Sequence, residues 1–394
     1  MTELQPLSAK QIKVALIYDR VNAPYGGAEQ VLLALQQLFP DAPLFTSIYQ
    51  EKKALWAKQF TVIPSFLNNI PLAKTAYRWF LPLMPLAFES LDLSAYQLII
   101  SVTSAEAKGV ITQPNQTHVC YLLTPPRYLY DFKTEYIQAL PLFKCPIVKF
   151  LIQQLLAYVK WWDQVAISRP DVIIPLSKLV QTRVKNIYHL ATGSVIYPPI
   201  DVINLASDDQ SLTQFSLPQE FLLVVSRLVP YKRLDLAISA SYQLKQNLVI
   251  VGEGPELTRL KRQTRQLAQT HQESRIYFLP TQPQSIVNAL IKKAKLFLAP
   301  GIDDFGLSPL QANLMGTPAI INAHSGVAEV FQAGIQGEKM SQLSSDALVT
   351  SLQKALSTTY NSAKMKNYVS QYNTNKFLHE FANVLQPFIS QYIN

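Results

Sequence analysis

The sequence predicts an α/β protein of two domains, each built around a parallel β-sheet. The chain has 394 residues, more than one ordinary hydrophobic core accommodates. Short apolar runs alternate with helix-like segments, as expected for strand–helix–strand units. The pattern restarts after a polar segment at residues 207–211, the best candidate for a linker. We therefore expect a first domain at residues 1–205 and a second at residues 206–375.

The first domain begins with a clear strand at residues 13–18, followed by an apolar helix at residues 29–38. Four more apolar runs are typical of buried strands: residues 97–101, 118–122, 171–175 and 194–197. Because crossovers between parallel strands are right-handed, these runs predict one sheet covered by helices. The second domain repeats the pattern, with runs at residues 221–226, 247–252, 275–279, 295–300 and 317–322.

Polar residues gather twice in the segment 301–330 of the second domain. Asp303 follows the fourth run and precedes an apolar helix at residues 308–315. After the fifth run, the Ser325–Gly326 turn opens a further helix, which carries Glu329. Ligands of open α/β sheets bind at the carboxyl ends of strands and the amino ends of helices. The segment is therefore predicted to form a binding site.

Composition narrows the class of protein. With 48% apolar and 15% charged residues, the chain is globular and not disordered. It contains no run of 18 apolar residues, so we expect no membrane-spanning helix. Residues 1–11 lack the layout of a signal peptide, and two cysteines are too few for a disulfide framework. We expect a cytoplasmic protein.

The net charge of +9 predicts an acidic partner: nucleic acid, an anionic membrane or a small acidic molecule. No nucleic-acid-binding motif is present, so we expect no nucleic acid partner. Residues 70–88 and 144–162 combine lysines and aromatics with apolar residues. In the second stretch, four apolar residues recur at helical spacing: Ile147, Leu151, Leu155 and Val159. This pattern fits an interfacial helix at the inner face of the cytoplasmic membrane and equally a core helix with a basic edge.

The segment 301–330 also carries a family resemblance. Asp303, Phe305–Gly306, Gln311 and the Gly316–Pro318 turn stand in the order and spacing of a known motif. With them, the segment resembles the donor-sugar site of the retaining nucleotide-sugar glycosyltransferases of the GT-B fold, family 4 or group 1. Three further segments are similar to the same family: YGGAE at 25–29, SRLVPYKRLD at 226–235 and VGEGPE at 251–256.

Residues 88–109, 120–131 and 195–201 resemble the mannosyltransferase-like branch of that family, which acts in polysaccharide and lipid-linked glycan assembly. The resemblance covers nearly the whole chain. It implies the GT-B architecture, in which two Rossmann-like domains with parallel sheets face each other across a cleft. It also implies that the final helix, residues 376–394, crosses back onto the first domain.

Arg227, Lys232 and Asp303 are the residues that the resemblance assigns to catalysis. Transfer from a nucleotide sugar leaves a diphosphate that carries new negative charge, which pre-placed cations stabilise. Arg227 offers a planar fork for phosphate oxygens and Lys232 a mobile point charge. Asp303 is assigned to the hydroxyls of the donor sugar. On spacing alone, the two cations would fit a solvated basic loop as well.

The remaining assignments concern donor and acceptor. Gln311 is expected to contact the ribose, and Glu329 to support the Ser325–Gly326 turn. Amides at the start of the 308–315 helix and at that turn are expected to contact diphosphate and sugar. The full donor-binding set is Gly26, Gly27, Gly306, Leu307, Ser308, Gln311 and Glu329. Ser104 and Arg127 are expected on the acceptor side.

The motif departs from the family pattern at several positions. Asp303 and Gln311 stand where the family has Glu, and Ser104 and Leu123 where the branch has His. Glu106 is the nearest ionisable replacement for the missing His, while His118 fits a structural role and His324 could face the donor. These departures favour an alternative, a catalytically silent nucleotide-sugar-binding or scaffold subunit. A third hypothesis is a GT-B epimerase.

The resemblance implies a retaining transferase. It would move a mannose-like sugar from a nucleotide-diphospho-sugar to a glycan or lipid-linked acceptor. We expect no cofactor besides the donor, and no metal, since the cations of the motif take that role and no ligand-spaced His/Asp cluster is apparent.

Overall fold

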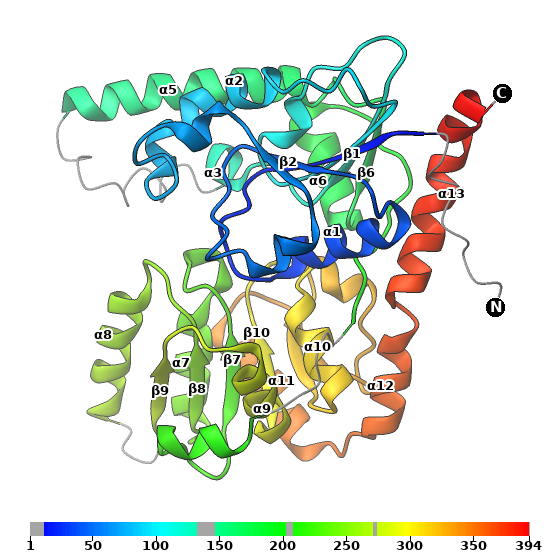
Figure 1. Ribbon diagram of the computed structural model, residues 1–394. Helices are drawn as coiled ribbons and strands as arrows, with labels where there is room; N and C mark the ends of the chain where they lie inside the picture. The colour runs from blue at the N-terminus through cyan, green and yellow to red at the C-terminus, as the bar shows by residue number, and fades with distance from the viewer. Residues whose placement is uncertain (1–11, 132–145, 202–207, 271–273, 394) are drawn as a thin grey trace. The chain divides into compact units, whose positions relative to one another are not determined.

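The structure is a computed structural model that describes residues 12–131, 146–201, 208–270 and 274–393 (Figure 1). It divides into two compact units. Unit 1 comprises residues 1–199 and 374–394, and unit 2 comprises residues 200–373. The predicted boundary between residues 205 and 206 lies outside the described residues, as do residues 1–11 and the first two residues of the 144–162 stretch.

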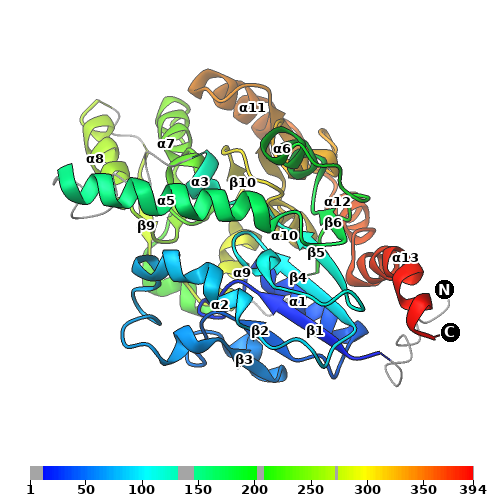
Figure 2. The same ribbon diagram turned by 90° about the horizontal axis from the view of Figure 1, so that it is seen from above.

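Unit 1 contains a six-stranded parallel sheet in the order β3-β2-β1-β4-β5-β6 (Figure 2). Its strands are β1 Val14–Tyr18, β2 Leu44–Thr46, β3 Val62–Pro64, β4 Leu98–Thr103, β5 Thr117–Leu122 and β6 Val172–Pro175. All residues of β1, β4 and β5 are buried, because helices cover both faces of a parallel sheet. Strand β1 lies between β2 and β4, so its carboxyl end is at the middle of the sheet edge.

The helices of unit 1 are α1 Gly27–Leu38, α2 Met84–Glu89, α3 Arg127–Tyr130, α5 Pro146–Ala166, α6 Lys178–Tyr188 and α13 Thr374–Ile393. Short 3-10 turns accompany them: η1 Leu55–Gln59, η2 Phe66–Asn69, η3 Tyr77–Leu83 and η4 Ala107–Gly109. Helix α13 packs Phe377 and Phe381 against Tyr121, with ring centroids 5.7 and 6.2 Å away. This aromatic contact holds the end of the chain on the sheet of unit 1.

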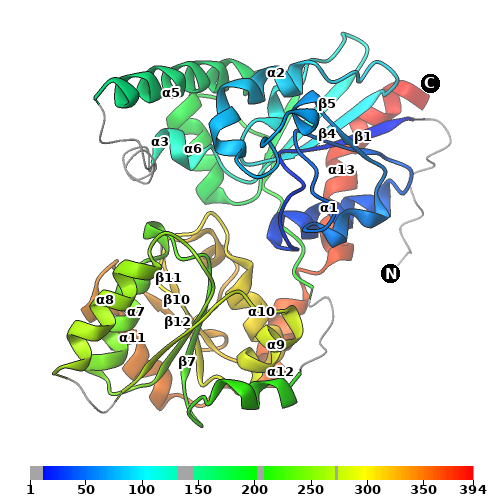
Figure 3. The same ribbon diagram turned by 60° about the vertical axis from the view of Figure 1, so that its left-hand side comes forward.

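Unit 2 contains a second six-stranded parallel sheet, in the order β12-β11-β10-β7-β8-β9. Its strands are β7 Leu222–Val225, β8 Leu248–Val251, β9 Ile276–Leu279, β10 Leu296–Ala299, β11 Ala319–Asn322 and β12 Gly337–Met340. Its helices are α7 Leu234–Gln243, α8 Leu257–Ala268, α9 Gln284–Lys293, α10 Leu307–Met315, α11 Ser345–Ser357 and α12 Ser362–Ser370. Figure 3 shows α7, α8 and α11 on one side of this sheet and α9, α10 and α12 on the other.

Every apolar run that the sequence analysis assigned to a strand overlaps a strand of the structure, except the run at residues 194–197. There the chain runs beside β6 and forms isolated backbone hydrogen bonds with it instead of a regular ladder. Gly193 N donates to Ile173 O at 2.8 Å and Ile196 N to Pro175 O at 3.2 Å. Pro198 and Pro199 follow immediately and have no N–H to continue the ladder. The prediction of a strand at residues 194–197 is therefore wrong.

Two further differences concern short elements. The helix expected after the Ser325–Gly326 turn is a single 3-10 turn, η7 Gly326–Glu329. The sequence analysis missed β2, β3 and β12. Strand β12 reads GEKM, and its buried Glu338 accepts a hydrogen bond from Lys354 at 2.8 Å, so a charged residue interrupts the apolar pattern. In the described part of the chain, no helix has the length and apolar character needed to span a bilayer.

Candidate functional site

Three loops meet at the carboxyl edge of the unit 2 sheet. The loop after β7 forms two backbone hydrogen bonds with the loop after β8. Leu228 N donates to Glu253 O at 2.8 Å, and Glu256 N donates to Leu228 O at 3.1 Å. The loop after β10 approaches the first loop so closely that a Cβ added to Gly301 would lie 2.3 Å from Tyr231 O. Only glycine permits this contact, so the motif segments around 226–235, 251–256 and 301–306 form one continuous edge.

The cations of this edge are held by neighbouring side chains. Lys232 Nζ lies 2.8 Å from Asp303 Oδ2, and the two side chains are 23% and 14% exposed. Arg227 is exposed, and its Nη2 donates to Tyr231 Oη at 2.9 Å. The structure therefore brings Lys232 and Asp303 together, with Arg227 held on the same loop. Two partly exposed cations at the carboxyl ends of parallel strands are suited to an anionic ligand.

Arg233, the third cation of the segment, serves the fold. Its backbone is left-handed, with φ of 51°, and its guanidinium pairs with Asp235 at 2.9 Å. Hydrogen bonding to Asp235 outweighs partial burial and raises the pKa of Arg233. This pair fixes the first turn of α7, directly after Lys232.

The Ser325–Gly326 turn supports the backbone around Asp303. Ser325 Oγ accepts from Asp303 N at 3.1 Å and donates to Gly301 O at 2.9 Å. Gly326 N donates to Asp303 O at 2.9 Å and Val327 N to Phe305 O at 2.8 Å. The amides at Gly326 and Val327 thus hold the Asp303 loop, and the prediction that this turn offers free amide donors to a ligand is wrong.

Helix α10 begins directly after this loop. Gly306 is its N-cap, with a left-handed φ of 92° that glycine adopts readily, and Leu307 and Ser308 form the first turn. Among the described residues no side chain caps this helix end, so the amides of the first turn remain the donors there. The half-buried Gln311 lies in the same helix, and its side chain forms no hydrogen bond within the described residues. Glu329 is half-buried at the end of η7.

In unit 1, the glycine turn of the YGGAE segment leads into α1. Gly26 is extended and Gly27 is the first residue of the helix. Glu29, which is buried, accepts from Tyr18 Oη at 2.7 Å. Burial, and then the charge of Glu29, raise the pKa of Tyr18 well above its usual range. Glu29 therefore ties α1 to the end of β1.

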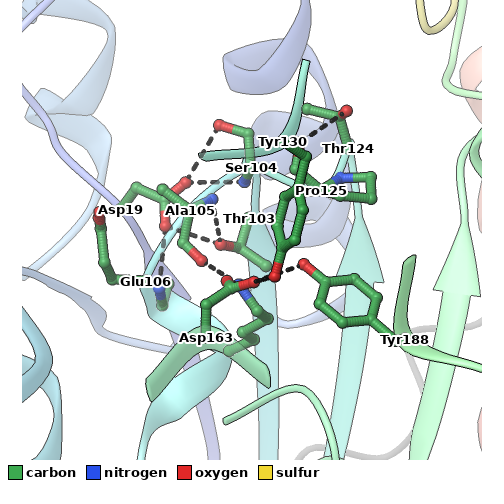
Figure 4. A network of polar contacts seen from close by, with 12 residues as sticks. Asp19, Thr103, Ser104, Ala105, Glu106, Thr124, Pro125, Tyr130, Asp163 and Tyr188 are labelled. Atoms are coloured by element: carbon green, nitrogen blue, oxygen red, sulfur yellow. Dashed lines mark hydrogen bonds and ion pairs between the residues drawn. The ribbon is translucent and has the colours of Figure 1, made fainter. Parts of the chain in front are cut away.

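Asp19, which the sequence analysis did not select, organises the edge of the unit 1 sheet (Figure 4). It follows β1, and its carboxylate accepts from Thr103 Oγ1 at 2.7 Å, Ala107 N at 2.9 Å and Ser104 N at 2.8 Å. Ser104 Oγ adds a bond of 3.3 Å. The sequence signal that could have identified Asp19 is its position as a carboxylate directly after the first strand. Ser104, predicted on the acceptor side, is thereby fixed at this edge.

Glu106 lies next to this group and is buried. It pairs with Arg20 Nη1 at 2.9 Å and accepts from Tyr128 Oη at 2.8 Å. Burial lowers the pKa of Arg20, but the charges of Glu106 and Asp19 outweigh it and raise that pKa above its usual value. Arg127, predicted on the acceptor side, is half-buried and begins α3 beside Tyr128. Glu106 thus anchors α3.

A second ion pair lies deeper in unit 1. Lys108 and Asp163 are fully buried, with Nζ and Oδ1 2.5 Å apart. Asp163 Oδ2 also accepts from Tyr130 Oη and Tyr188 Oη, both at 2.7 Å (Figure 4). Burial and the charge of Asp163 raise the pKa of both tyrosines. This network joins α3, α5 and α6 to the turn after β4.

The fold of this chain is similar to that of solved structures. The chain is similar to Anabaena Alr3699/HepE, solved in complex with UDP-glucose, with a TM-score of 0.66 and 19% identity over 95% of this chain and all of that one. It is also similar to sucrose-phosphate synthase from Thermosynechococcus elongatus, with a TM-score of 0.69 and 14% identity over 96% of this chain and all of that one. The chain has the GT-B fold.

Sequence comparisons find similarity to a known family in part of the chain. Residues 209–375, all but the last two of which lie in unit 2, match the family Glycosyl transferases group 1. The putative colanic acid biosynthesis glycosyltransferase WcaL of Salmonella typhimurium is 29% identical over 204 residues, 47% of each chain. The D-inositol 3-phosphate glycosyltransferase of Mycolicibacterium smegmatis is 28% identical over 152 residues, 36% of this chain and 35% of its own. The matches span about half the length of these relatives or less.

Two histidines named in the sequence analysis, His118 and His324, have different surroundings. His118 is fully buried in β5, with Nε2 2.8 Å from Ser101 Oγ. Burial, and then the charge of Arg169, lower its pKa to about 3. His324 is exposed, and its backbone N donates to Asn322 Oδ1 at 2.9 Å. His118 thus belongs to the core of the sheet, and His324 to the loop after β11.

Proposed function

We propose that the protein is a group 1 glycosyltransferase that uses a nucleotide-diphospho-sugar as donor. The family match over residues 209–375, the GT-B fold and the UDP-bound neighbours support this proposal. In finer terms, we propose a mannose-like sugar, a glycan or lipid-linked acceptor and retention of configuration. The resemblance of residues 88–109 and 120–131 to the mannosyltransferase-like branch supports the finer statement.

The contact between Lys232 and Asp303 carries the proposal. It lies where the loops after β7 and β10 meet, and Gly301 makes that meeting possible. Lys232 has three N–H donors and uses one for Asp303, so donors remain for phosphate oxygens. Arg227 adds a guanidinium on the same loop. These cations would stabilise the charge that develops on the departing diphosphate.

The donor sugar and ribose would lie on either side of these cations. Asp303 is the carboxylate available to sugar hydroxyls, and the first-turn amides of α10, at Leu307 and Ser308, would add donors. Gln311, whose side chain has no partner among the described residues, would accept from the ribose. Glu329 would support the Asp303 loop from η7.

The reaction we propose proceeds on one face of the sugar. The bond between the anomeric carbon and the diphosphate oxygen breaks, and the acceptor hydroxyl oxygen bonds to the same face. Its proton passes to the departing diphosphate, which acts as the base. The step then needs no protein base at Ser104 or Leu123. We propose that the diphosphate is held by Arg227 and Lys232 without a metal.

Unit 1 would shape the acceptor side. Asp19 fixes Ser104, and Glu106 and Arg20 hold the start of α3, where Arg127 lies. The Gly26–Gly27 turn offers backbone without side chains, so a substrate can approach it closely. A lipid-linked acceptor would bring the protein to the inner face of the cytoplasmic membrane.

A binding and turnover panel tests the proposal. Thermal shift and calorimetry with UDP, GDP and ADP should show binding of at least one of them, and the matching nucleotide sugar should be hydrolysed slowly or transferred. Absence of binding to all three would contradict the proposal. Because Asp303, Gln311 and Ser104 depart from the family pattern, the second candidate is a silent nucleotide-sugar-binding subunit. It predicts the same binding with no turnover for any donor.

A further inference from the structure

Helix α5 carries an apolar face that stays exposed among the described residues of unit 1. Besides Val165 near the end of the helix, six large residues on it are between 43% and 72% exposed: Ile147, Phe150, Leu151, Leu155, Tyr158 and Trp161. At 100° per residue they fall within an arc of about 140°. We call these six residues the α5 face.

The opposite side of helix α5 packs into the hydrophobic core of unit 1. Leu156, Val159 and Trp162 are at most 5% exposed. The sequence analysis grouped Val159 with Ile147, Leu151 and Leu155, and this grouping is wrong, because Val159 points into the core while the other three are exposed. A surface helix ordinarily has one apolar side and one polar side. The α5 face is therefore not explained by the folding of unit 1.

A neighbouring segment extends this apolar surface. Helix α5 packs against η3, which in turn packs against α2, and Figure 1 shows α2 beside α5. Trp79, Leu83 and Leu86 of this segment are between 39% and 53% exposed. Contiguous exposed apolar residues on this scale are typical of a binding surface.

The charges on and next to this surface are mostly positive, and Glu89, at the end of α2, is paired with Arg169 at 2.6 Å. Between Glu51 and Glu89 the chain has five basic residues and no acidic one: Lys52, Lys53, Lys58, Lys74 and Arg78. All five are exposed. On α5, residues 147–162 include Lys149 and Lys160 and no acidic residue, and the first carboxylate, Asp163, is buried. A partner of this surface must accept apolar side chains and also carry negative charge.

We propose that the α5 face and the η3–α2 segment dock on an anionic phospholipid bilayer. The helix would lie along the bilayer surface, with Phe150, Leu151 and Trp161 in the boundary between headgroups and acyl chains. Tyr158 and Trp161 are amphipathic aromatics of the kind that favours this boundary. Lys74 and Arg78 would attract the lipid phosphates. This deepens the proposed function by naming the surface that brings the protein to a lipid-linked acceptor, although docking itself requires no sugar transfer.

Co-sedimentation with vesicles tests the proposal. The 394-residue protein is mixed with vesicles of phosphatidylcholine alone or with added phosphatidylglycerol. We expect binding to the anionic vesicles that weakens as salt rises, because screening removes the lysine and arginine contributions. The double variant Phe150→Ser/Trp161→Ser should bind about tenfold less or weaker still, since two large apolar side chains lose their buried area.

Two further variants sharpen the test. Leu343→Ser, which replaces an exposed apolar residue of unit 2 that is 37% exposed, is the matched control and should bind as the wild type does. Lys74→Glu/Arg78→Glu should lower binding to anionic vesicles about tenfold. Circular dichroism and thermal unfolding check that each variant is folded.

The contrary outcomes are distinct. No binding to anionic vesicles, or binding that Phe150→Ser/Trp161→Ser leaves unchanged, would overturn the proposal. A concentration-dependent dimer that this variant abolishes, without vesicle binding, would assign the α5 face to a second copy of the chain. Nucleotide titration is run in parallel: vesicle binding without nucleotide binding would contradict only the proposed transferase function.

Discussion

The carboxyl edges of the two sheets have the same topology and use their charged residues in opposite ways. In unit 1, Asp19 and Glu106 are buried and accept hydrogen bonds from the loops around them. In unit 2, Lys232 and Asp303 form a partly exposed pair beside an exposed Arg227. Position at a strand end therefore does not decide whether a charged side chain is buried among internal partners or stays accessible to a ligand.

This difference assigns two tasks to the two edges. A buried, fully bonded carboxylate such as Asp19 rigidifies its surroundings, and removing its partners is costly. A partly exposed cation such as Lys232 contributes little to stability and remains available to phosphate. The predictions below test this division, beginning with the largest expected effect.

Asp163→Asn should destabilise the protein by about 3–5 kcal/mol, because it leaves Lys108 charged and unpaired in the core. Urea unfolding measures the loss. The exposed pair of Lys295 and Glu220 is the matched control, and Lys295→Ala should change stability by less than about 1 kcal/mol. Similar losses in both variants would mean that the burial of the Lys108–Asp163 pair has no energetic consequence.

Lys232→Ala should lower the transfer rate about a hundredfold or more while leaving the fold intact, as expected when one donor to a developing charge is removed. Steady-state kinetics with the donor identified in the nucleotide panel measures the rate. Arg233→Ala is the control on the same loop, since Arg233 pairs with Asp235 and should affect stability more than rate. Equal rate losses in the two variants would contradict the distinct roles of these residues.

His118 should make unit 1 sensitive to acid. Burial and Arg169 lower its pKa to about 3, whereas its value in the unfolded chain is about 6.5. As pH falls from 6.5 towards 3, the unfolded state takes up the proton first, so the free energy of unfolding falls by up to about 1.4 kcal/mol per pH unit. His118→Gln should reduce this slope in urea unfolding at pH 7 and pH 5. An unchanged slope would assign the acid sensitivity elsewhere.

Gln311→Glu gives the smallest expected effect. If Gln311 contacts the ribose, a carboxylate should form stronger hydrogen bonds and tighten donor binding by about 1 kcal/mol, or about fivefold. The donor KM should fall with little change in kcat, because the ribose is held alike in the ground and transition states. Weaker binding, with no turnover in either protein, would favour the silent subunit.

The sequence predicted much of unit 2 and less of unit 1, for a physical reason. The unit 2 edge is built from short contiguous motifs, such as residues 226–235, whose spacing is visible in the chain. The unit 1 networks join residues far apart, 84 positions between Asp19 and Thr103 and 55 between Lys108 and Asp163. No local sequence pattern predicts contacts between residues so far apart in the chain.

Exposure was the other property that the sequence could not supply. Helical spacing grouped Val159 with Ile147, yet only the fold determines that one of them is buried and the other exposed. The amides of the Ser325–Gly326 turn are a similar case. Their partners, Asp303 O and Phe305 O, become apparent only once the loops are folded together.

Calorimetric titration of the preferred nucleoside diphosphate into the wild type, Lys232→Ala and Asp303→Asn tests the central claim most directly. The claim is that Lys232 at the unit 2 edge binds the diphosphate, whereas Asp303 acts on the sugar. Lys232→Ala should then bind the nucleotide at least about tenfold more weakly, since a charged hydrogen bond is lost. Asp303→Asn should bind it as tightly as the wild type or more so, because a neighbouring negative charge is removed, while transfer of the sugar is lost. Unchanged affinity in Lys232→Ala, or equal weakening in both variants, would contradict the account.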